Sequence, residues 1–276
     1  DAAARLDAEL EFARAIQLSS LPKVNAILDI AEHQKNKGFD LHAVMFTAKE
    51  VGGDFYDFFF IDDRYLVVIV ADVSGKGIPA ALFMMTLKPL IRGYAEANLS
   101  AAEVFTKTNS RLCESSDSKM FVTAFMGILD TQTGKFTYVN AGHNPPLIRR
   151  KETGFVFIKP RPGLVLAAIE TIEYKQVELQ MFPNDMLFLY TDGVTEALNP
   201  ALELFSEERL LRALNRIPSD ASPAEVLIHV KAAVDEFSQN TPQADDITML
   251  GLEYKGPATL YIQSGQNPLQ NYMLYP

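Results

Sequence analysis

The sequence is poor in cysteine and contains no long apolar run. Cys113 is the only cysteine among 276 residues, so no disulfide can form within the chain and no cysteine-rich zinc site exists. This cysteine usage fits a reducing, cytosolic compartment. No apolar run is long enough to span a membrane, and the acidic residues 1–10 do not resemble a signal peptide. We therefore expect a cytoplasmic protein without membrane insertion. Because the sequence does not begin with methionine, we also expect a fragment, which could be the cytosolic part of a larger sensor or membrane protein.

Basic residues are also scarce. Lysine and arginine total 25 against 35 aspartates and glutamates, and the formal net charge is −10. Nucleic-acid backbones are bound by clustered Lys and Arg, so this balance argues against nucleic acid as the main ligand. The same balance is compatible with binding metal cations. Hydrophobic residues make up 48% of the chain, enough for a sizeable core in one large domain or two small ones.

The N-terminal segment has the composition of a helix. Residues 3–19 contain no Gly or Pro, and Pro22 marks the end of the pattern. A short seam with coiled-coil spacing runs along this segment: Leu6, Leu10, Ala13 and Gln17. A free helix of this length is marginal in water, so it should pack on a second copy of the chain or on the main domain.

From residue 39 onward the chain alternates between groups of strands and groups of helices. Segments rich in Val, Ile, Phe, Tyr and Thr predict strands at 41–49, 55–62, 65–72, 121–130, 135–142, 185–192 and 246–254. Helical patterns occupy 78–95, 101–115, 206–216 and 223–237. The TQTG segment at 131–134 predicts a hairpin. This order predicts an α+β fold with mostly antiparallel sheets covered by helices, and not a doubly wound α/β fold.

Three segments follow from this pattern. We predict a linker and dimerisation helix over residues 1–21, through which the protein forms a homodimer. The main domain should occupy residues 22–256. Residues 257–276 have the composition of a polar tail outside the domain.

Aspartates stand at the ends of four apolar strands. Asp72 ends VVIVAD, Asp192 ends LFLYTD, and Asp54 follows two glycines before FYDFFF. Asp245 and Asp246 precede the last strand. Any single Asp here is best explained by the preference of this residue for strand ends, but four sites together weaken that explanation. Carboxylates gathered at one place need cations, and hard ions such as Mg²⁺ or Mn²⁺ prefer oxygen ligands. Two such ions can activate a water and hold a phosphoryl group.

A glycine-rich turn follows Asp72 and leads into a predicted helix. Residues 74–77, SGKG, would place backbone N–H groups at a helix N-terminus, which favours an anion. The turn is not a nucleotide P-loop, because Val70 stands where the first glycine belongs and Gly77 stands where Ser or Thr belongs. A receiver domain with Asp72 as phospho-acceptor is disfavoured, because the expected alternation of strands and helices is missing.

Taken together, these motifs resemble the metal-dependent PPM (type 2C) protein phosphatases, and more narrowly their bacterial SpoIIE and RsbU-like branch. The matching stretches occur in the family's order over about residues 40–254: VGGDFYD (51–57), ADVSGKG (71–77), MFVTAFMGILD (120–130), VNAGHNPPL (139–147), LYTDGVTEA (189–197) and ADDIT (244–248). The segment EFARAIQLSSLP resembles the linker helix of RsbU-like proteins. The resemblance implies an antiparallel β-sandwich flanked by helices, preceded by this helix.

The resemblance also implies two Mn²⁺ or Mg²⁺ ions at one edge of the sandwich. Carried over by motif, Asp72 would bridge both ions. Asp54 and the carbonyl of Val73 would complete one site. Asp192 and Asp245 would complete the other.

Asp246 follows the last of these ligands and would support or share its site. A metal-bound hydroxide would attack phosphoserine or phosphothreonine in line. By analogy with the family, the substrate would be a phosphorylated anti-anti-sigma factor with a STAS fold. The alternatives are a regulated pseudophosphatase that only binds its partner, and a two-metal phosphoesterase acting on small molecules.

Two positions differ from the eukaryotic members of the family. Glu50 stands where they carry an arginine that holds the substrate phosphate, and Ser74 stands where they carry a histidine proposed as general acid. The bacterial branch typically lacks both residues. Another group must therefore hold the phosphate, and we predict Lys76 with the backbone of Gly75 and Gly77.

The remaining candidate residues have simpler interpretations. His143, in a proline-rich turn, should be a hydrogen-bonded residue of the fold and not a metal ligand. The segment 160–170 resembles the flap near the family's active site, and Ala167 stands in it where glycine is common.

Overall fold

The computed structural model describes residues 2–22, 38–115, 120–159 and 163–257. Residues 258–276 of the predicted tail, residues 23–37 of the predicted domain and residues 160–162 of the segment 160–170 lie outside the described residues. The predicted domain boundaries stay predictions.

Within these described residues, ten strands form two antiparallel sheets. Sheet A has the order β1-β10-β9-β6-β7 and sheet B the order β2-β3-β4-β5-β8. The strands of sheet A are β1 (Phe39–Phe46), β10 (Ile247–Tyr254), β9 (Met186–Tyr190), β6 (Leu147–Arg150) and β7 (Gly154–Phe157). The strands of sheet B are β2 (Phe55–Phe60), β3 (Tyr65–Val73), β4 (Val122–Asp130), β5 (Lys135–Ala141) and β8 (Val177–Gln180).

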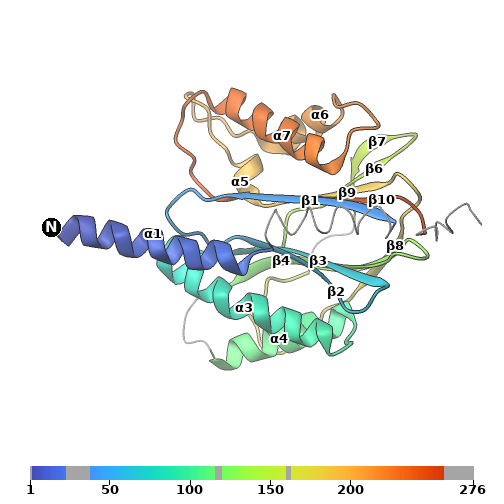
Figure 1. The fold of residues 1–276 in the computed structure, drawn as a ribbon, viewed down its shortest axis with the longest axis horizontal. Helices are drawn as coiled ribbons and strands as arrows, with labels where there is room; N and C mark the ends of the chain where they lie inside the picture. Colours follow the sequence, from blue (N-terminus) through green and yellow to red (C-terminus); the bar gives the residue numbers. More distant parts are fainter. Residues whose placement is uncertain (1, 23–37, 116–119, 160–162, 258–276) are drawn as a thin grey trace, which may run out of the picture.

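Helices cover the two outer faces of this sandwich (Figure 1). The helices α3 (Ile78–Glu96) and α4 (Ala101–Ser115) lie on sheet B, and α6 (Ser206–Leu214) and α7 (Pro223–Ser238) lie on sheet A. The single turn α5 (Asp192–Thr195) follows β9, and α1 (Ala2–Ser20) projects from one side. The α+β sandwich flanked by helices is therefore confirmed, with a helix in front of it. None of the described helices combines the length and apolar character needed to cross a bilayer.

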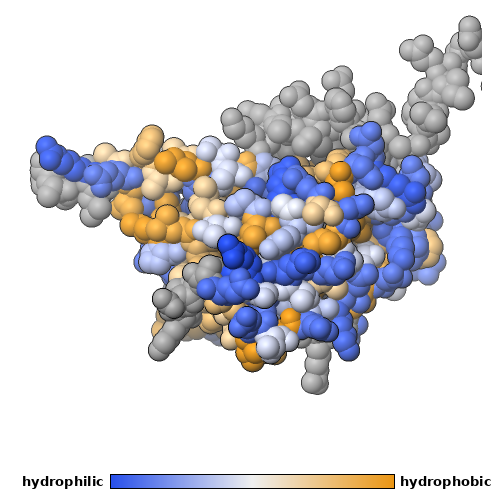
Figure 2. Space-filling model, turned by 90° about the horizontal axis from the view of Figure 1, so that it is seen from below, coloured by the Kyte–Doolittle hydropathy of each residue, from blue (hydrophilic) through white to orange (hydrophobic). Residues whose placement is uncertain are grey.

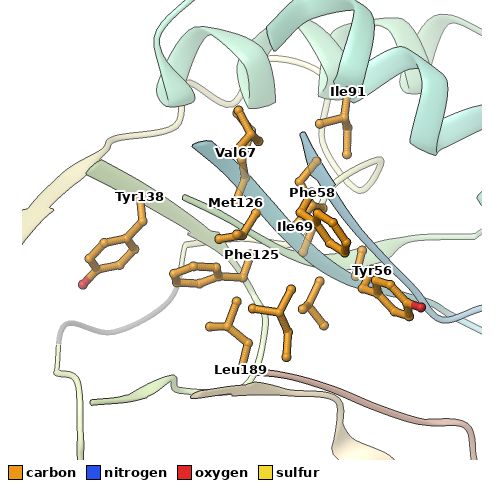
Figure 3. Close-up of a cluster of buried hydrophobic side chains, with 14 of the residues drawn as sticks. Tyr56, Phe58, Val67, Ile69, Ile91, Phe125, Met126, Tyr138 and Leu189 are labelled. Atoms are coloured by element: carbon orange, nitrogen blue, oxygen red, sulfur yellow. The ribbon is translucent and has the colours of Figure 1, made fainter. Parts of the chain in front are cut away.

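The hydrophobic core has two parts because neighbouring residues of a strand face opposite sides of a sheet. In β9, Leu187 and Leu189 join the core between the sheets, whereas Met186, Phe188 and Tyr190 join the core under α6 and α7. Figure 3 shows the first core, with Leu189 on one side of the sheet B strands and Ile91 of α3 on the other. The strand is thus buried on both faces, which explains its unbroken apolar sequence.

The sequence-based prediction found the long elements and missed the short ones. The TQTG hairpin joins β4 to β5, and α7 begins with a capping box in which the side chains and backbone of Ser222 and Glu225 bond each other. The strands β6, β7 and β8 were not predicted, because each has four residues and two of them carry several polar side chains. The helix α6 ends at Leu214, two residues before the predicted end.

Candidate metal and active site

The fold brings the predicted aspartates to one edge of the sandwich. In sheet B, Phe55 pairs with Ala71, so Asp54 before β2 and Asp72 near the end of β3 lie at the same end of two antiparallel strands. In sheet A, Tyr190 pairs with Met249, which places Asp192 after β9 beside the residues that precede β10. Those residues are Asp245 and Asp246. We call these five aspartates the acid edge.

Hydrogen bonds join the two sheets at the acid edge. The Thr191 hydroxyl donates to Asp54 Oδ2 at 2.7 Å and accepts the backbone N–H of Thr248 at 2.9 Å. Asp246 accepts the backbone N–H groups of Ala48 at 2.8 Å and Gly53 at 2.9 Å. Asp246 therefore fixes the loop that carries Asp54, which suits the supporting role expected for it.

Two glycines allow this close approach. A Cβ at Gly52 would collide with the Asp246 carboxylate, and a Cβ at Gly193 would collide with the Asp246 backbone carbonyl. A Cβ at Gly53 would lie 2.8 Å from the carbonyl oxygen of Val73. The Val73 carbonyl, a predicted metal ligand, thus lies against the loop that leads to Asp54. The glycines beside the acids serve close packing of the backbone.

The acids of the edge repel one another. Burial raises the pKa of Asp54 well above its usual range, and the charges of Asp72 and Asp246 raise it further. Burial also raises the pKa of Asp72, with the charges of Asp192 and Asp245 adding to it. The pKa of Asp192 is raised to about 6, first by burial and then by Glu196 and Asp245. The carboxylates are therefore close enough to repel one another electrostatically, and a divalent cation would relieve this repulsion.

The donor set fits a hard divalent cation, because it consists of carboxylates and one backbone carbonyl. Asp72, Asp192 and Asp245 are half-buried, whereas Asp54 and Asp246 are buried. Among the described residues no three acidic, histidine or cysteine side chains already stand in the arrangement of a metal site. Several carboxylate oxygens accept bonds from the protein instead, including those on Asp54 and Asp246.

Lys76 lies on the acid edge. Its Nζ is 2.8 Å from Asp245 Oδ2 and donates to the carbonyl of Ala244 at 2.6 Å. The predicted phosphate-binding lysine is therefore paired here with a predicted metal ligand. Gly75 and Gly77 flank it with φ values of 93° and 74°, in the left-handed region that favours glycine, and Gly77 is the N-cap of α3.

The other candidate positions have structural roles. Ser74 accepts the backbone N–H of Phe121 at 2.9 Å, and Glu50 is exposed. His143 is buried and lies 3.0 Å from the Thr123 hydroxyl through Nδ1, and burial lowers its pKa to about 4. The interpretation of His143 as a hydrogen-bonded residue of the fold is thus confirmed. Ala167 adopts a φ of 66°, a conformation that explains why glycine would suit this position.

Sequence reasoning missed two residues that shape the site. Thr191 was not singled out, although it stands directly before Asp192. Gln17 was predicted on a helix seam that packs on a second copy of the chain or on the main domain. Its amide makes two hydrogen bonds with the backbone of Gly52, at 2.6 and 3.1 Å, so this residue packs on the main domain. No local pattern could reveal this contact, because 35 residues separate the two partners.

The family model of stage II sporulation protein E (SpoIIE) matches residues 62–255. The chain belongs to the SpoIIE family. This match covers four of the five aspartates of the acid edge and leaves Asp54 just outside it.

Two curated relatives are about 30% identical to the chain over the aligned residues. The protein IcfG of a Synechocystis species is 30% identical over 279 residues, which cover 88% of this chain and 41% of IcfG. The phosphoserine phosphatase RsbU of Bacillus subtilis is 32% identical over 162 residues, which cover 59% of this chain and 48% of RsbU. The chain thus spans less than half the length of these relatives.

Solved structures share the fold. The SiaA-PP2C domain of Pseudomonas aeruginosa superposes with a TM-score of 0.76 and 19% identity, over 92% of this chain and 99% of that one. Two more distant structures with the same fold contain metal: RsbX with magnesium, at a TM-score of 0.59 and 17% identity, and PstP with two manganese ions, at a TM-score of 0.53 and 15% identity. They cover 78% of this chain and 95% and 98% of their own. The SpoIIE-family chain thus has the PP2C phosphatase fold, in which divalent ions are bound by other members.

Proposed function

We propose that this protein is a metal-dependent serine/threonine phosphatase that acts on a regulatory protein in bacterial signalling. One observation carries the proposal: a SpoIIE-family chain brings five aspartates from both sheets to one edge, and three of them are only half-buried. The relative named phosphoserine phosphatase supports phosphoserine as the bond broken. Carboxylates at a solvent-facing edge are the ligands that magnesium and manganese phosphatase sites require.

Two Mn²⁺ or Mg²⁺ ions would be held by the acid edge in the proposed enzyme. Asp72 interacts both with Asp54 and with the charges of Asp192 and Asp245, so it is the residue suited to contact both ions. Asp54 and the Val73 carbonyl belong to one side, and Asp192 and Asp245 to the other. Bound ions would supply charge neutralisation and an acidified water at neutral pH.

The protein itself would position the substrate phosphate. The backbone of Gly75 and Gly77 precedes the N-terminus of α3, where N–H groups and the helix dipole attract anions. A substrate phosphate would compete with Asp245 for Lys76, because the ammonium group lies 2.8 Å from that carboxylate. We propose that Lys76 exchanges between these two anions.

The substrate proposed is a phosphorylated STAS-type anti-anti-sigma protein. Support comes from the relationship to RsbU and from the acidic character of the chain, which does not suit nucleic acid. The test measures hydrolysis of a phosphoserine STAS protein and of p-nitrophenyl phosphate while Mn²⁺ and Mg²⁺ are titrated. Turnover that depends on metal and prefers the protein substrate is expected. Equal turnover of both would favour a small-molecule phosphoesterase, and none at any metal concentration would favour a pseudophosphatase.

We propose that the linker helix α1 forms the homodimer contact and couples dimerisation to the geometry of the acid edge. Phe12 and Ile16 are 70% and 47% exposed on α1, and Ile78 and Leu82 are 50% and 65% exposed on the adjacent α3. Figure 2 shows apolar surface gathered toward the side where α1 projects. Water-exposed apolar side chains on one side of a molecule favour association.

Gln17 links this surface to the site. Its two hydrogen bonds hold Gly52, which packs on Asp246 and lies two residues before Asp54. Light scattering on Phe12→Glu is expected to show a monomer, while Arg14→Glu, which places a glutamate on the opposite face of the same helix, stays dimeric. Dimers in both variants would remove α1 from the interface.

A further inference from the structure

A second cavity lies at the far end of the molecule from the acid edge. It has a volume of about 560 Å³ and is enclosed by the β6–β7 hairpin, the end of α6 and the end of β10. The residues that matter for its chemistry are Arg149, Lys151, Phe155, Leu214, Glu253 and Lys255. Its size falls within the range of small-molecule sites, roughly 300–1,000 Å³.

The cavity is separate from the acid edge. The strand β10 begins next to Asp246 and ends at Tyr254, so its eight residues span roughly 23 Å at about 3.3 Å per residue. Glu253 and Lys255, at the far end of this strand, line the cavity. Figure 1 shows the β6–β7 hairpin at this end and α5 toward the other. A ligand here would not touch the five aspartates.

Arg149 is the buried cation of this cavity. Its side chain is 5% exposed, Nη1 donates to the carbonyl of Ala221 at 2.8 Å, and Nη2 lies 3.5 Å from Glu253 Oε1. Nη2 makes no hydrogen bond to any described residue, although the atom is buried. An unmet donor on a buried guanidinium is costly, and an oxyanion would satisfy it.

Further cations surround Arg149. Lys151 and Arg150 lie on the same hairpin, and Lys255 Nζ is 2.7 Å from Glu253 Oε2. Arg150 is engaged by Asp185 at 2.6 Å, and Glu253 is shared by Arg149 and Lys255. Among the described residues, the cavity is thus lined by four basic residues against two acids, Glu253 and Asp220, in a chain whose net charge is −10. Such a local excess favours an anionic ligand.

We propose that this cavity binds a small phosphate-bearing molecule. Its phosphate would lie between Lys151 and Lys255, and Arg149 would turn its buried Nη2 from Glu253 toward it. Its organic part would pack on the wall made by Phe155, Leu214 and Ile217. A guanidinium fork with two ammonium groups matches the oxygens of a phosphate, and the volume leaves room for more than inorganic phosphate.

Calorimetric titration of the whole chain with phenylphosphonate tests the proposal. The probe combines a non-hydrolysable phosphonate with an aromatic ring, and a chelator removes divalent ions so that the acid edge repels it. Saturable binding is expected. It should weaken at least about tenfold in Lys151→Gln, the loss of one charge-assisted contact. Lys107→Gln, an exposed lysine on α4, is the matched control and should bind unchanged.

Two further variants keep the outcome decisive. Arg149→Lys retains the charge but loses the fork, and it should also weaken binding. Asp192→Asn changes only the acid edge and should leave binding intact. Absence of saturable binding, or binding that responds to Asp192→Asn and not to Lys151→Gln, would overturn the proposal. Because the titration measures no turnover, this result is independent of the proposed phosphatase activity.

Discussion

Two lysine–aspartate ion pairs involve α3 and the turn before it. Their nitrogen–oxygen distances are equal, but the two pairs differ in burial. Lys88 Nζ lies 2.8 Å from Asp57 Oδ2, with side chains 10% and 0% exposed. Lys76 Nζ lies 2.8 Å from Asp245 Oδ2, with side chains 44% and 33% exposed. Lys88 is on α3, and Lys76 stands two residues before it. The first pair belongs to the interior and the second to the acid edge.

The difference separates an acid of the fold from an acid of the site. Asp57 is fully buried beside its own lysine, with Arg92 3.8 Å away, so the chain supplies the cations that the carboxylate needs. Asp54, three residues earlier, is also buried, but its carboxylate faces Thr191 and other acids. In the proposed enzyme, such an acid would be neutralised by a cation from outside the chain. Asp245 is an intermediate case, because its partner Lys76 is exposed enough to move away when another cation binds.

The largest effect is expected from breaking the buried pair. Lys88→Met leaves Asp57 without its nearest cation in the core, and removing one partner of a buried pair costs about 3–5 kcal/mol. Urea unfolding should show this loss of stability. The double variant Asp57→Asn/Lys88→Met should recover part of it. A loss below about 1 kcal/mol in Lys88→Met would show that the pair is not a structural contact.

Removing an acid from the edge should have the opposite consequence for stability. Asp72→Asn is expected to abolish metal-dependent hydrolysis, by more than about 100-fold, since changes even one shell outside a metal site cost 10–100-fold. In chelator the variant should unfold at the same urea concentration as the parent or higher, because repulsion with Asp192 and Asp245 is relieved. Retained activity, or a clear loss of stability, would make Asp72 a residue of the fold.

The exposed pair of Lys76 and Asp245 can be tested at the acid edge itself. Lys76→Gln frees Asp245 and removes a competing charge, so Mn²⁺ should bind up to about fivefold more tightly, in line with an exposed pair worth at most 1 kcal/mol. Calorimetric titration with Mn²⁺ measures this. Unchanged Mn²⁺ affinity together with a raised KM for the phosphoprotein would assign Lys76 to the substrate phosphate alone.

The sequence predicted this arrangement only in part. The long apolar strands predicted the sandwich, and the aspartates at their ends predicted the acid edge. Both features can be recognised within a few neighbouring residues of the sequence. The partners of those aspartates could not be found in this way. Lys76 meets Ala244 across 168 residues, and Thr191 meets Asp54 across 137. Such contacts depend on the packing of the two sheets, and no period or motif encodes them.

A third ion pair provides a reference for the effect of burial on the stability contributed by Lys88 and Lys76. Lys135 Nζ lies 2.7 Å from Glu178 Oε1 across β5 and β8, and both side chains are more than half exposed. Lys135→Gln should change the free energy of unfolding by less than about 1 kcal/mol, and by less still in high salt. Urea unfolding at two salt concentrations checks this. Since the three pairs are equally short, a ranking of Lys88 far above Lys135 would assign the effect to burial, and equal losses would assign it to distance.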